Sequence, residues 1–351
     1  SNDALIWDND ELSFDKDIKI VISHSVKGVV DRKMSMMSQE SCDLLEYAAV
    51  IGREFSFVLL REVTGINEGH LFDIIDEILD MRLLKEIDKE RFYFSEDVIR
   101  EVIYQQINTK KSKNYHQIVG EKLLELHRDS VEEVVEELSH HYYLCEDKVS
   151  AIKFSMLAAD RAKDAYANSD AIEFYSKALE CLEEVKIENS KLKEIECLKK
   201  RSDVLELTGE YERATEDLNK AISISSGMQN GSEEAECLIK LCKVFFGMSH
   251  YDDTIKMAEI ALKINKNMKQ EKGEAECLKT IGIANWYLGE FEKSLKFYQS
   301  SLEIAKKIDD PKLQAMILGN SSIIYWNMGK YSKSLNYYLR SLEITKSIGN
   351  I

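Results

Sequence analysis

The residue types that bind transition metals cluster at only one place in this sequence. His140, His141 and Cys145 lie close together, and His141 and Cys145 have the i, i+4 spacing that places two side chains on one helix face. A zinc site needs three or four converging ligands, and no further close set of Cys and His is present. The sequence therefore predicts no metal site here.

Aspartates near the start of the chain have the spacing of oxygen ligands for calcium. They are Asp8, Asp10, Asp15 and Asp17. An EF-hand loop that begins at Asp8 needs glycine at position 13 and glutamate at position 19. Ser13 and Lys19 stand there instead, so we predict no calcium loop.

Motifs for nucleotide binding and nucleophilic catalysis are also missing. The phosphate-binding pattern GxxxxGK[ST] does not occur, and Gly329-Lys330 is followed by Tyr331. The nucleophile motif G-x-S-x-G is absent as well. The many carboxylates alternate with lysines, as is typical of solvated helix faces. We predict no catalytic residue, no bound cofactor and no enzyme activity for this chain.

The charge and the cysteine content limit the partners and the compartment. The chain has 47 Lys and Arg against 63 Asp and Glu, a net charge of −16, which disfavours nucleic acid as a partner. No apolar run is long enough to cross a membrane, and the start lacks a secretory signal. Seven cysteines without a CxxC pair indicate reduced thiols and a cytoplasmic protein.

The second half of the chain repeats every 40 residues. One proline and 15 glycines in 351 residues favour long helices over β-structure. Each repeat predicts two helices, which in the last unit run from Pro311 to Met328 and from Tyr331 to Ile348, with Asp310 as the N-cap. Aromatic residues mark the second helices at Tyr211, Tyr251, Phe291 and Tyr331, and buried cysteines are predicted at Cys197, Cys237 and Cys277.

Small residues recur where the two helices of each unit must cross: Ser202, Cys242, Gly282 and Ser322. With this pattern, residues 148–351 resemble tetratricopeptide repeats. The 40-residue period and the missing closing proline imply longer helices than the usual 34-residue unit. Residues 349–351 align with a joint between repeats and no polar capping helix follows, so we expect that the natural protein continues or that a partner or second copy buries this end.

The same resemblance implies a binding groove lined by the first helix of each pair. It would place large side chains side by side at Phe246, Ile283, Trp286, Tyr287, Ile323, Trp326 and Asn327. Two interpretations stay open. These side chains form a docking surface for a protein or peptide, or the longer helices bury them between repeats.

The first half predicts a small domain of three helices and a β-hairpin. The pattern indicates helices within residues 38–63 and from Glu68 to Arg82, strands at 83–87 and 91–94, and a further helix from Asp97 to Ile107. This order is that of a winged helix. Residues 38–107 carry seven Lys and Arg against sixteen Asp and Glu, so we expect packing rather than DNA binding.

Two segments of this half, 48–55 (AAVIGREF) and 94–104 (FSEDVIREVIY), resemble the region that follows the ATPase core in multidomain STAND signalling ATPases. Glu96 departs from the histidine usual in that family. The resemblance implies an ATPase module that precedes residue 1 in the natural protein.

We therefore expect a mostly α chain, in which a winged helix with one β-hairpin precedes an α-α superhelix. Its function would be that of a non-catalytic regulatory fragment whose repeats sense a partner or ligand. The alternative is a stand-alone tetratricopeptide receptor for peptides. The expected domains are a linker or trailing edge of an upstream module at 1–37, the winged helix at 38–107, connecting helices at 108–147 and the repeats at 148–351.

Overall fold

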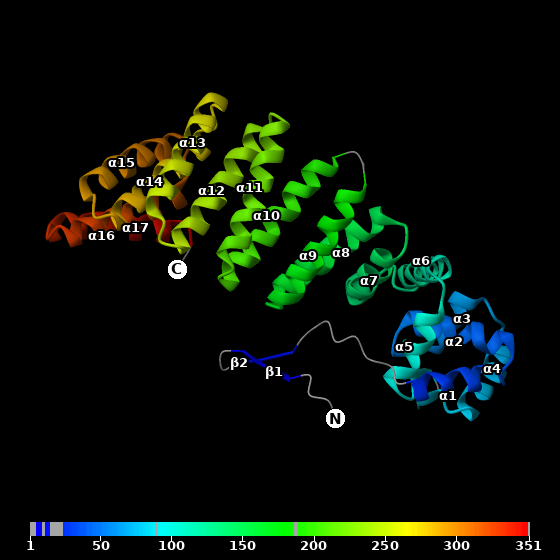
Figure 1. The fold of residues 1–351 in the computed structure, drawn as a ribbon. Coiled ribbons are helices and arrows are strands. Elements are labelled where there is room, and N and C mark those ends of the chain that lie inside the picture. The colour runs from blue at the N-terminus through cyan, green and yellow to red at the C-terminus, as the bar shows by residue number, and fades with distance from the viewer. Residues whose placement is uncertain (1–4, 9–10, 15–23, 89, 186–188, 350–351) are drawn as a thin grey trace. The chain divides into compact units, whose positions relative to one another are not determined.

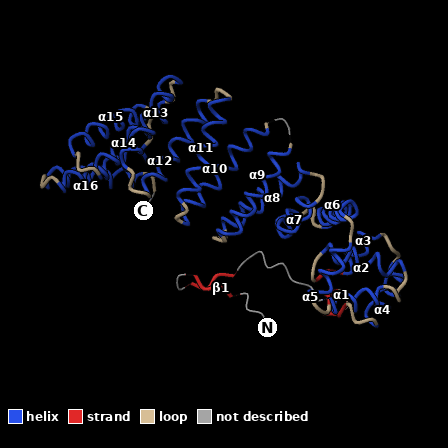
Figure 2. Tube along the Cα trace, viewed as in Figure 1, coloured by secondary structure: helices blue, strands red, loops and turns tan. Residues whose placement is uncertain are grey.

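The computed structural model describes residues 5–8, 11–14, 24–88, 90–185 and 189–349. Two compact units make up the chain, Ser1–Phe154 and Ser155–Ile351. Helices dominate both units, as the blue trace in Figure 2 shows, which confirms the prediction of a mostly α chain.

The first unit combines short helices with a three-stranded antiparallel sheet in the order β3-β5-β4. A separate strand pair, β1 with β2, precedes them. The elements are β1 (Leu5–Asp8), β2 (Glu11–Phe14), α1 (His24–Met34), α2 (Gln39–Ile51), β3 (Glu54–Ser56), α3 (Phe57–Thr64), α4 (Glu68–Asp80), β4 (Leu84–Asp88), β5 (Arg91–Phe94), α5 (Asp97–Gln106), α6 (Thr109–Leu126), the 3-10 helix η1 (Val131–Val134) and α7 (Val135–Leu144).

The predicted hairpin is confirmed as β4 and β5, but the sequence did not predict β3. Phe55 of β3 lies opposite Phe92 of β5, and its ring contacts Phe94 edge-on at 6.0 Å between centroids. A strand of three residues is too short to show alternation, and it forms because Phe55 is buried against these rings. Segment 1–37, which we expect to be a linker or the trailing edge of an upstream module, contains β1, β2 and α1.

Side-chain caps explain where several helices of this unit begin. Ser38 accepts a hydrogen bond from the Ser41 amide at the start of α2, and Ser56 accepts one from the Leu59 amide at the start of α3. Such caps satisfy amides that have no partner within the helix. They explain why α2 begins after Ser38, within the predicted helical segment, and why α3 begins after Ser56.

The second unit is a succession of antiparallel helices, each packed on the next in the chain, shown from green to red in Figure 1. Asp310 caps the last pair by accepting from the Leu313 amide, with Pro311 in the first turn, as predicted. The helices are α8 (Lys148–Asp164), which begins in the first unit, α9 (Asn168–Glu184), α10 (Ser190–Thr208), α11 (Tyr211–Gly227), α12 (Gly231–Gly247), α13 (Tyr251–Met268), α14 (Glu271–Tyr287), α15 (Phe291–Lys307), α16 (Pro311–Asn327) and α17 (Tyr331–Ser347).

The two helices of a repeat approach closely at their small residues. Ser294 of α15 donates a hydrogen bond to the Gly282 carbonyl of α14 at 2.6 Å, and Ser301 donates to the Ala275 carbonyl at 2.7 Å. Forty residues later, Ser334 and Ser341 make the same two bonds to α16. The predicted cysteines at 197, 237 and 277 are buried in these interiors.

Gly282 and Gly319 give a matched test of this close approach. A Cβ at Gly282 would lie 2.6 Å from the Tyr298 ring, whereas one at Gly319 would meet only the Ser341 Oγ at 3.5 Å. We expect Gly282→Ala to destabilise the repeats by about 1–3 kcal/mol through overpacking. Gly319→Ala should be neutral or stabilise by up to about 1 kcal/mol, because alanine favours helix. Urea unfolding followed by circular dichroism measures both, and equal effects would contradict the packing described.

Candidate functional site

The first helices of successive repeats place the candidate groove residues at equivalent positions. Phe246 lies on α12, Trp286 on α14 and Trp326 on α16, each as the last residue but one of its helix. None of the seven candidates is fully buried. Trp326 is 62% exposed, Tyr287 48% and Ile323 44%, Asn327 is exposed, and Phe246, Ile283 and Trp286 are half-buried.

An aromatic cluster joins two neighbouring repeats. Tyr287 of α14 lies against Phe246 of α12 edge-on at 4.7 Å and stacks on Tyr251 of α13 at 5.1 Å. Trp286 meets Tyr287 at 4.7 Å. These offset and edge-on contacts are those that aromatic rings favour. The cluster fixes the rings in place while leaving nearly half of Tyr287 in contact with solvent.

Trp286 and Trp326 occupy the same repeat position in different surroundings. Trp286 packs against the apolar cluster that includes Tyr298 and Ile324 of the next helices. Trp326 contacts Tyr331 at 4.9 Å and is otherwise largely open. The sequence left open whether these side chains are exposed for docking or buried between repeats. Trp286 packs between repeats, whereas Trp326 is exposed.

A small apolar pocket lies between α12 and α14 beside this cluster. Its volume is about 270 Å³, and Phe246, Ile283 and Cys242 are among its lining residues. Lys279 at its edge is paired with Glu276. The pocket has the size and lining to take one apolar side chain of a ligand.

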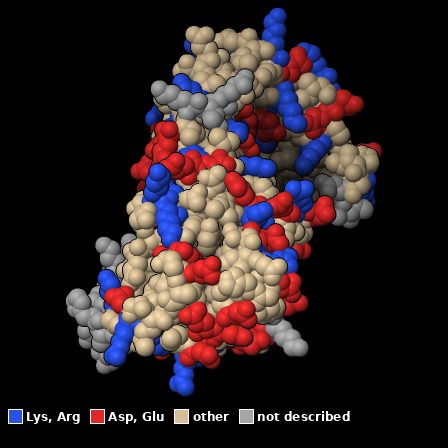
Figure 3. Space-filling model, turned by 90° about the vertical axis from the view of Figure 1, so that its right-hand side faces the viewer, with Lys and Arg blue, Asp and Glu red and all other residues tan. Residues whose placement is uncertain are grey.

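The preceding helices carry charged side chains at the positions that Ile283 and Thr280 occupy in α14 and that Ile323 and Asn320 occupy in α16. Asp203 of α10 pairs with Lys163 at 3.7 Å and also with Lys240, and Lys200 pairs with Asp160 at 2.8 Å. Figure 3 shows Lys and Arg interspersed with Asp and Glu on the face in view. Because these cations already have carboxylate partners, they do not form a clamp for an anionic ligand.

The first unit buries His141 in a hydrogen-bonded group with His116 and Tyr104, whereas His140 is exposed. The Nδ1 atoms of His116 and His141 lie 2.9 Å apart, and the Tyr104 hydroxyl lies 2.8 Å from His116 Nε2. His140 is a ring neighbour of both, and no cluster of three metal-binding side chains occurs within the described residues. Local spacing did not reveal the contacts of His116, because its partners come from two other helices, α5 and α7.

Comparison with known proteins finds a family match within the last two repeats. Residues 274–347 match the tetratricopeptide repeat family. Helices α14–α17 are tetratricopeptide repeats. Searching the curated proteins gives no match. Among the described helices, none combines the length and apolar character needed to cross a bilayer.

Three solved structures illustrate the likeness of the tetratricopeptide array. BtubC (BKLC) from P. vanneervenii has 16% identity and a TM-score of 0.52 over 66% of this chain and 93% of its own, and it shares the fold. A STAND protein with a tetratricopeptide repeat sensor from Pyrococcus horikoshii has 15% identity and a TM-score of 0.46, covering 92% of this chain and 53% of its own. The Rap conjugation gene regulator of plasmid pLS20, solved with the Phr* peptide, has 17% identity and a TM-score of 0.48. The match covers 89% of this chain and 76% of the regulator.

The buried histidine pair predicts that the first unit loses stability in acid. Burial, with the nearby His140, lowers the pKa of His116 from 6.5 to about 4, and burial also lowers the pKa of His141. The unfolded chain therefore takes up protons first, and stability falls as the pH drops from about 6.5 to about 4. For His116, this lowering of the pKa corresponds to a loss of about 3 kcal/mol.

Urea unfolding between pH 7 and pH 4 measures this loss. His116→Gln/His141→Gln should lose less stability over that range than the natural chain, because glutamine does not titrate. His250→Gln changes an exposed histidine and serves as the control. An unchanged pH dependence in the double variant would show that the pair does not govern acid stability.

Proposed function

We propose that the repeat array binds a protein or peptide through the groove segment of α12, α14 and α16. The observation that carries this proposal is the run of exposed apolar and aromatic side chains at equivalent positions, above all Trp326, Tyr287 and Ile323. Contiguous apolar surface is unfavourable in water, and Trp and Tyr dominate the binding energy of protein interfaces.

The pocket beside Phe246 supports a ligand with an apolar anchor. It lies on the same segment as Ile283, so one ligand could fill the pocket and contact the aromatic cluster at once. The paired charges on α8 and α10 support a specificity set by shape and apolar contact rather than by a strong electrostatic attraction.

In the wider protein, we infer a non-catalytic regulatory role in the cytoplasm. The segments 48–55 and 94–104, which resemble the region after the core of STAND ATPases, contribute to α2, β3, β5 and α5 of the described sheet-and-helix domain. An ATPase module in cis would receive the signal, and binding in the groove would change how the array packs against that module. The acidic α4 supports a packing role for this domain rather than DNA binding.

A stand-alone tetratricopeptide receptor for peptides is the second candidate. The open groove fits it equally well, whereas the motif segments of the first unit favour the ATPase context. The reading frame upstream of the first residue separates the two: a GxxxxGK[ST] motif there supports the regulatory fragment, and a start codon near residue 1 supports the receptor.

Peptides selected from a displayed random library against the whole chain test the groove. We expect Trp326→Ala to weaken the binding of the selected peptides about 30-fold, the effect of losing an aromatic hot spot. Calorimetry measures the affinity, and circular dichroism should show an unchanged fold because Trp326 is largely exposed.

Ile260→Ala is the matched control, since Ile260 is also exposed but lies on α13, outside the groove segment. It should leave binding unchanged. Peptides that bind Trp326→Ala as tightly as the natural chain would contradict the proposed site. Trp286→Ala is unsuitable as the main test, because Trp286 packs against the core cluster and its loss would destabilise the repeats.

A further inference from the structure

A hollow of about 500 Å³ lies between α13, α14 and α15, away from the groove segment. Ile281 and Asn285 line it from α14, whereas the groove residues Ile283 and Trp286 lie on the opposite face of the same helix, as the period of the α-helix requires. The other residues that matter for its chemistry come from α13, from the turn after α14 and from α15. They are Asp252, Ile255, Glu259, Glu290, Lys293 and Phe297.

The hollow lies where one repeat lacks an aromatic ring. The residues equivalent to Asn285 are Phe245 in the preceding repeat and Tyr325 in the following one. The ring of Tyr325 packs against Tyr337 of α17 at 5.0 Å between centroids. Phe297 of α15 holds the position of Tyr337, but the short side chain of Asn285 leaves the space beside it unfilled.

Asn285 brings an unpaired hydrogen-bond acceptor to this hollow. The residue is only 5% exposed, and its Nδ2 atom donates to the Ile281 carbonyl at 2.8 Å. A carbonyl can accept only from the amide nitrogen, so the Oδ1 atom is the one left for another partner. Among the described residues, none donates to this oxygen. A buried polar atom without a partner is unfavourable, which favours a ligand that carries a hydrogen-bond donor.

The charges that line the hollow favour a cation. Asp252 and Glu259 have the i, i+7 spacing that places both on one face of α13, and neither forms an ion pair with a described residue. Glu290 pairs with Lys293 at 3.3 Å, so three carboxylates and one ammonium group give the lining a net charge of −2. The carboxylate at 259 is particular to the repeat that lacks the ring. The equivalent residues elsewhere are Asn219, Gln299 and Leu339.

The apolar part of the lining selects among cations. Ile255 and Phe297 pack against the core cluster that contains Ile281, so the hollow has an apolar floor with an aromatic ring. A guanidinium group is flat, stacks on aromatic faces and is more weakly hydrated than an ammonium group. Its several N–H donors can reach the Asn285 oxygen and a carboxylate at the same time.

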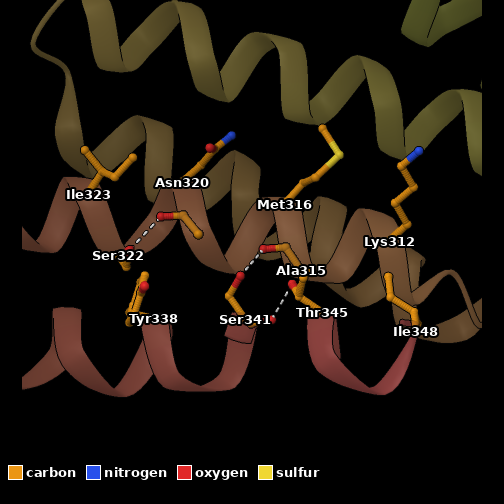
Figure 4. A pocket seen from close by; sticks show the side chains of 11 residues that line it. Lys312, Ala315, Met316, Asn320, Ser322, Ile323, Tyr338, Ser341, Thr345 and Ile348 are labelled. Atoms are coloured by element: carbon orange, nitrogen blue, oxygen red, sulfur yellow. Dashed lines mark hydrogen bonds between the residues drawn. The ribbon is translucent and has the colours of Figure 1, made fainter. Parts of the chain in front are cut away.

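The hollow of about 400 Å³ between α16 and α17 has a different chemistry, which Figure 4 shows. Its hydroxyl groups are already used, since Ser341 donates to the Ala315 carbonyl at 2.7 Å and Thr345 donates to the Ser341 carbonyl at 2.9 Å. Lys312 is the one charged residue in the lining that the structure describes. A cation is therefore favoured in the hollow at Asn285 and disfavoured in this one.

We propose that the hollow between α13, α14 and α15 binds an alkylguanidinium group, the charged end of an arginine side chain. The group would donate to Asn285 Oδ1, stack on Phe297 and face the carboxylates of Asp252 and Glu259. An arginine within a polypeptide and a free small guanidinium compound both present this group. The site lies outside the groove segment and does not depend on what the groove binds.

N-acetyl-L-arginine amide is the probe, because the guanidinium group carries its only charge. Ile255 reports binding to the whole chain through its δ-methyl NMR signal, which its loss in Ile255→Val assigns. At low salt this signal should shift in a saturable way. N-acetyl-L-lysine amide should bind several-fold more weakly, and the uncharged N-acetyl-L-citrulline amide about tenfold more weakly.

Asp252→Asn/Glu259→Gln should weaken binding of the arginine probe about fivefold, the effect of losing exposed charge pairs. Glu212→Gln/Glu216→Gln removes two exposed carboxylates from α11 and is the matched control, which should bind as the natural chain does. Asn285→Phe fills the hollow with the ring that the preceding repeat has, and it should abolish binding without lowering the Tm.

Equal affinity of the natural chain and the Asp252→Asn/Glu259→Gln variant overturns the proposal, and so does equal affinity for the arginine and citrulline probes. A shift that does not saturate overturns it as well. Two further probes separate the sources of the group. Tighter binding of a pentapeptide with arginine between glycines than of ethylguanidinium supports a polypeptide ligand, and the reverse order supports a free guanidinium compound.

Discussion

The close approach of the two helices within each repeat is the constraint on which the second unit depends. A serine hydroxyl of the second helix can reach a carbonyl of the first only where no large side chain intervenes. Ser294 and Ser334 make this bond to Gly282 and Ser322, forty residues apart. These buried bonds fix the rotation of the helices in the last two repeats, and the shared 40-residue period gives α12 and α13 the same register. The line of side chains at 246, 286 and 326 follows from that register.

The same register explains why equivalent residues have different environments. Trp286 is half-buried because α16 packs beside it, and Tyr298 is buried for the same reason. Trp326 is the equivalent of Trp286, and Tyr338 is the equivalent of Tyr298. No described helix covers either of these later residues. Whether an aromatic side chain at a given repeat position is buried or exposed therefore depends on the helix that packs beside it. The repeat that carries the side chain changes little.

The sequence predicted the features that come from local spacing. The helix pairs, the start at Pro311, the buried cysteines and the hairpin of β4 and β5 all follow from periodicity and capping. It could not predict β3, whose three residues are ordered by contact with Phe92 and Phe94. Nor could it predict the His116–His141 bond or the exposure of Trp326, since both depend on helices distant in the chain or on what packs beside a helix.

The account depends most on an open aromatic segment around Trp326, and tryptophan fluorescence tests this directly. The chain has three tryptophans, so Trp7→Phe/Trp286→Phe leaves only Trp326 and Trp7→Phe/Trp326→Phe leaves only Trp286. Acrylamide should quench Trp326 several-fold more efficiently than Trp286, with emission at longer wavelength. Equal shielding of the two rings would show that Trp326 is covered, and would contradict a groove surface available to a partner.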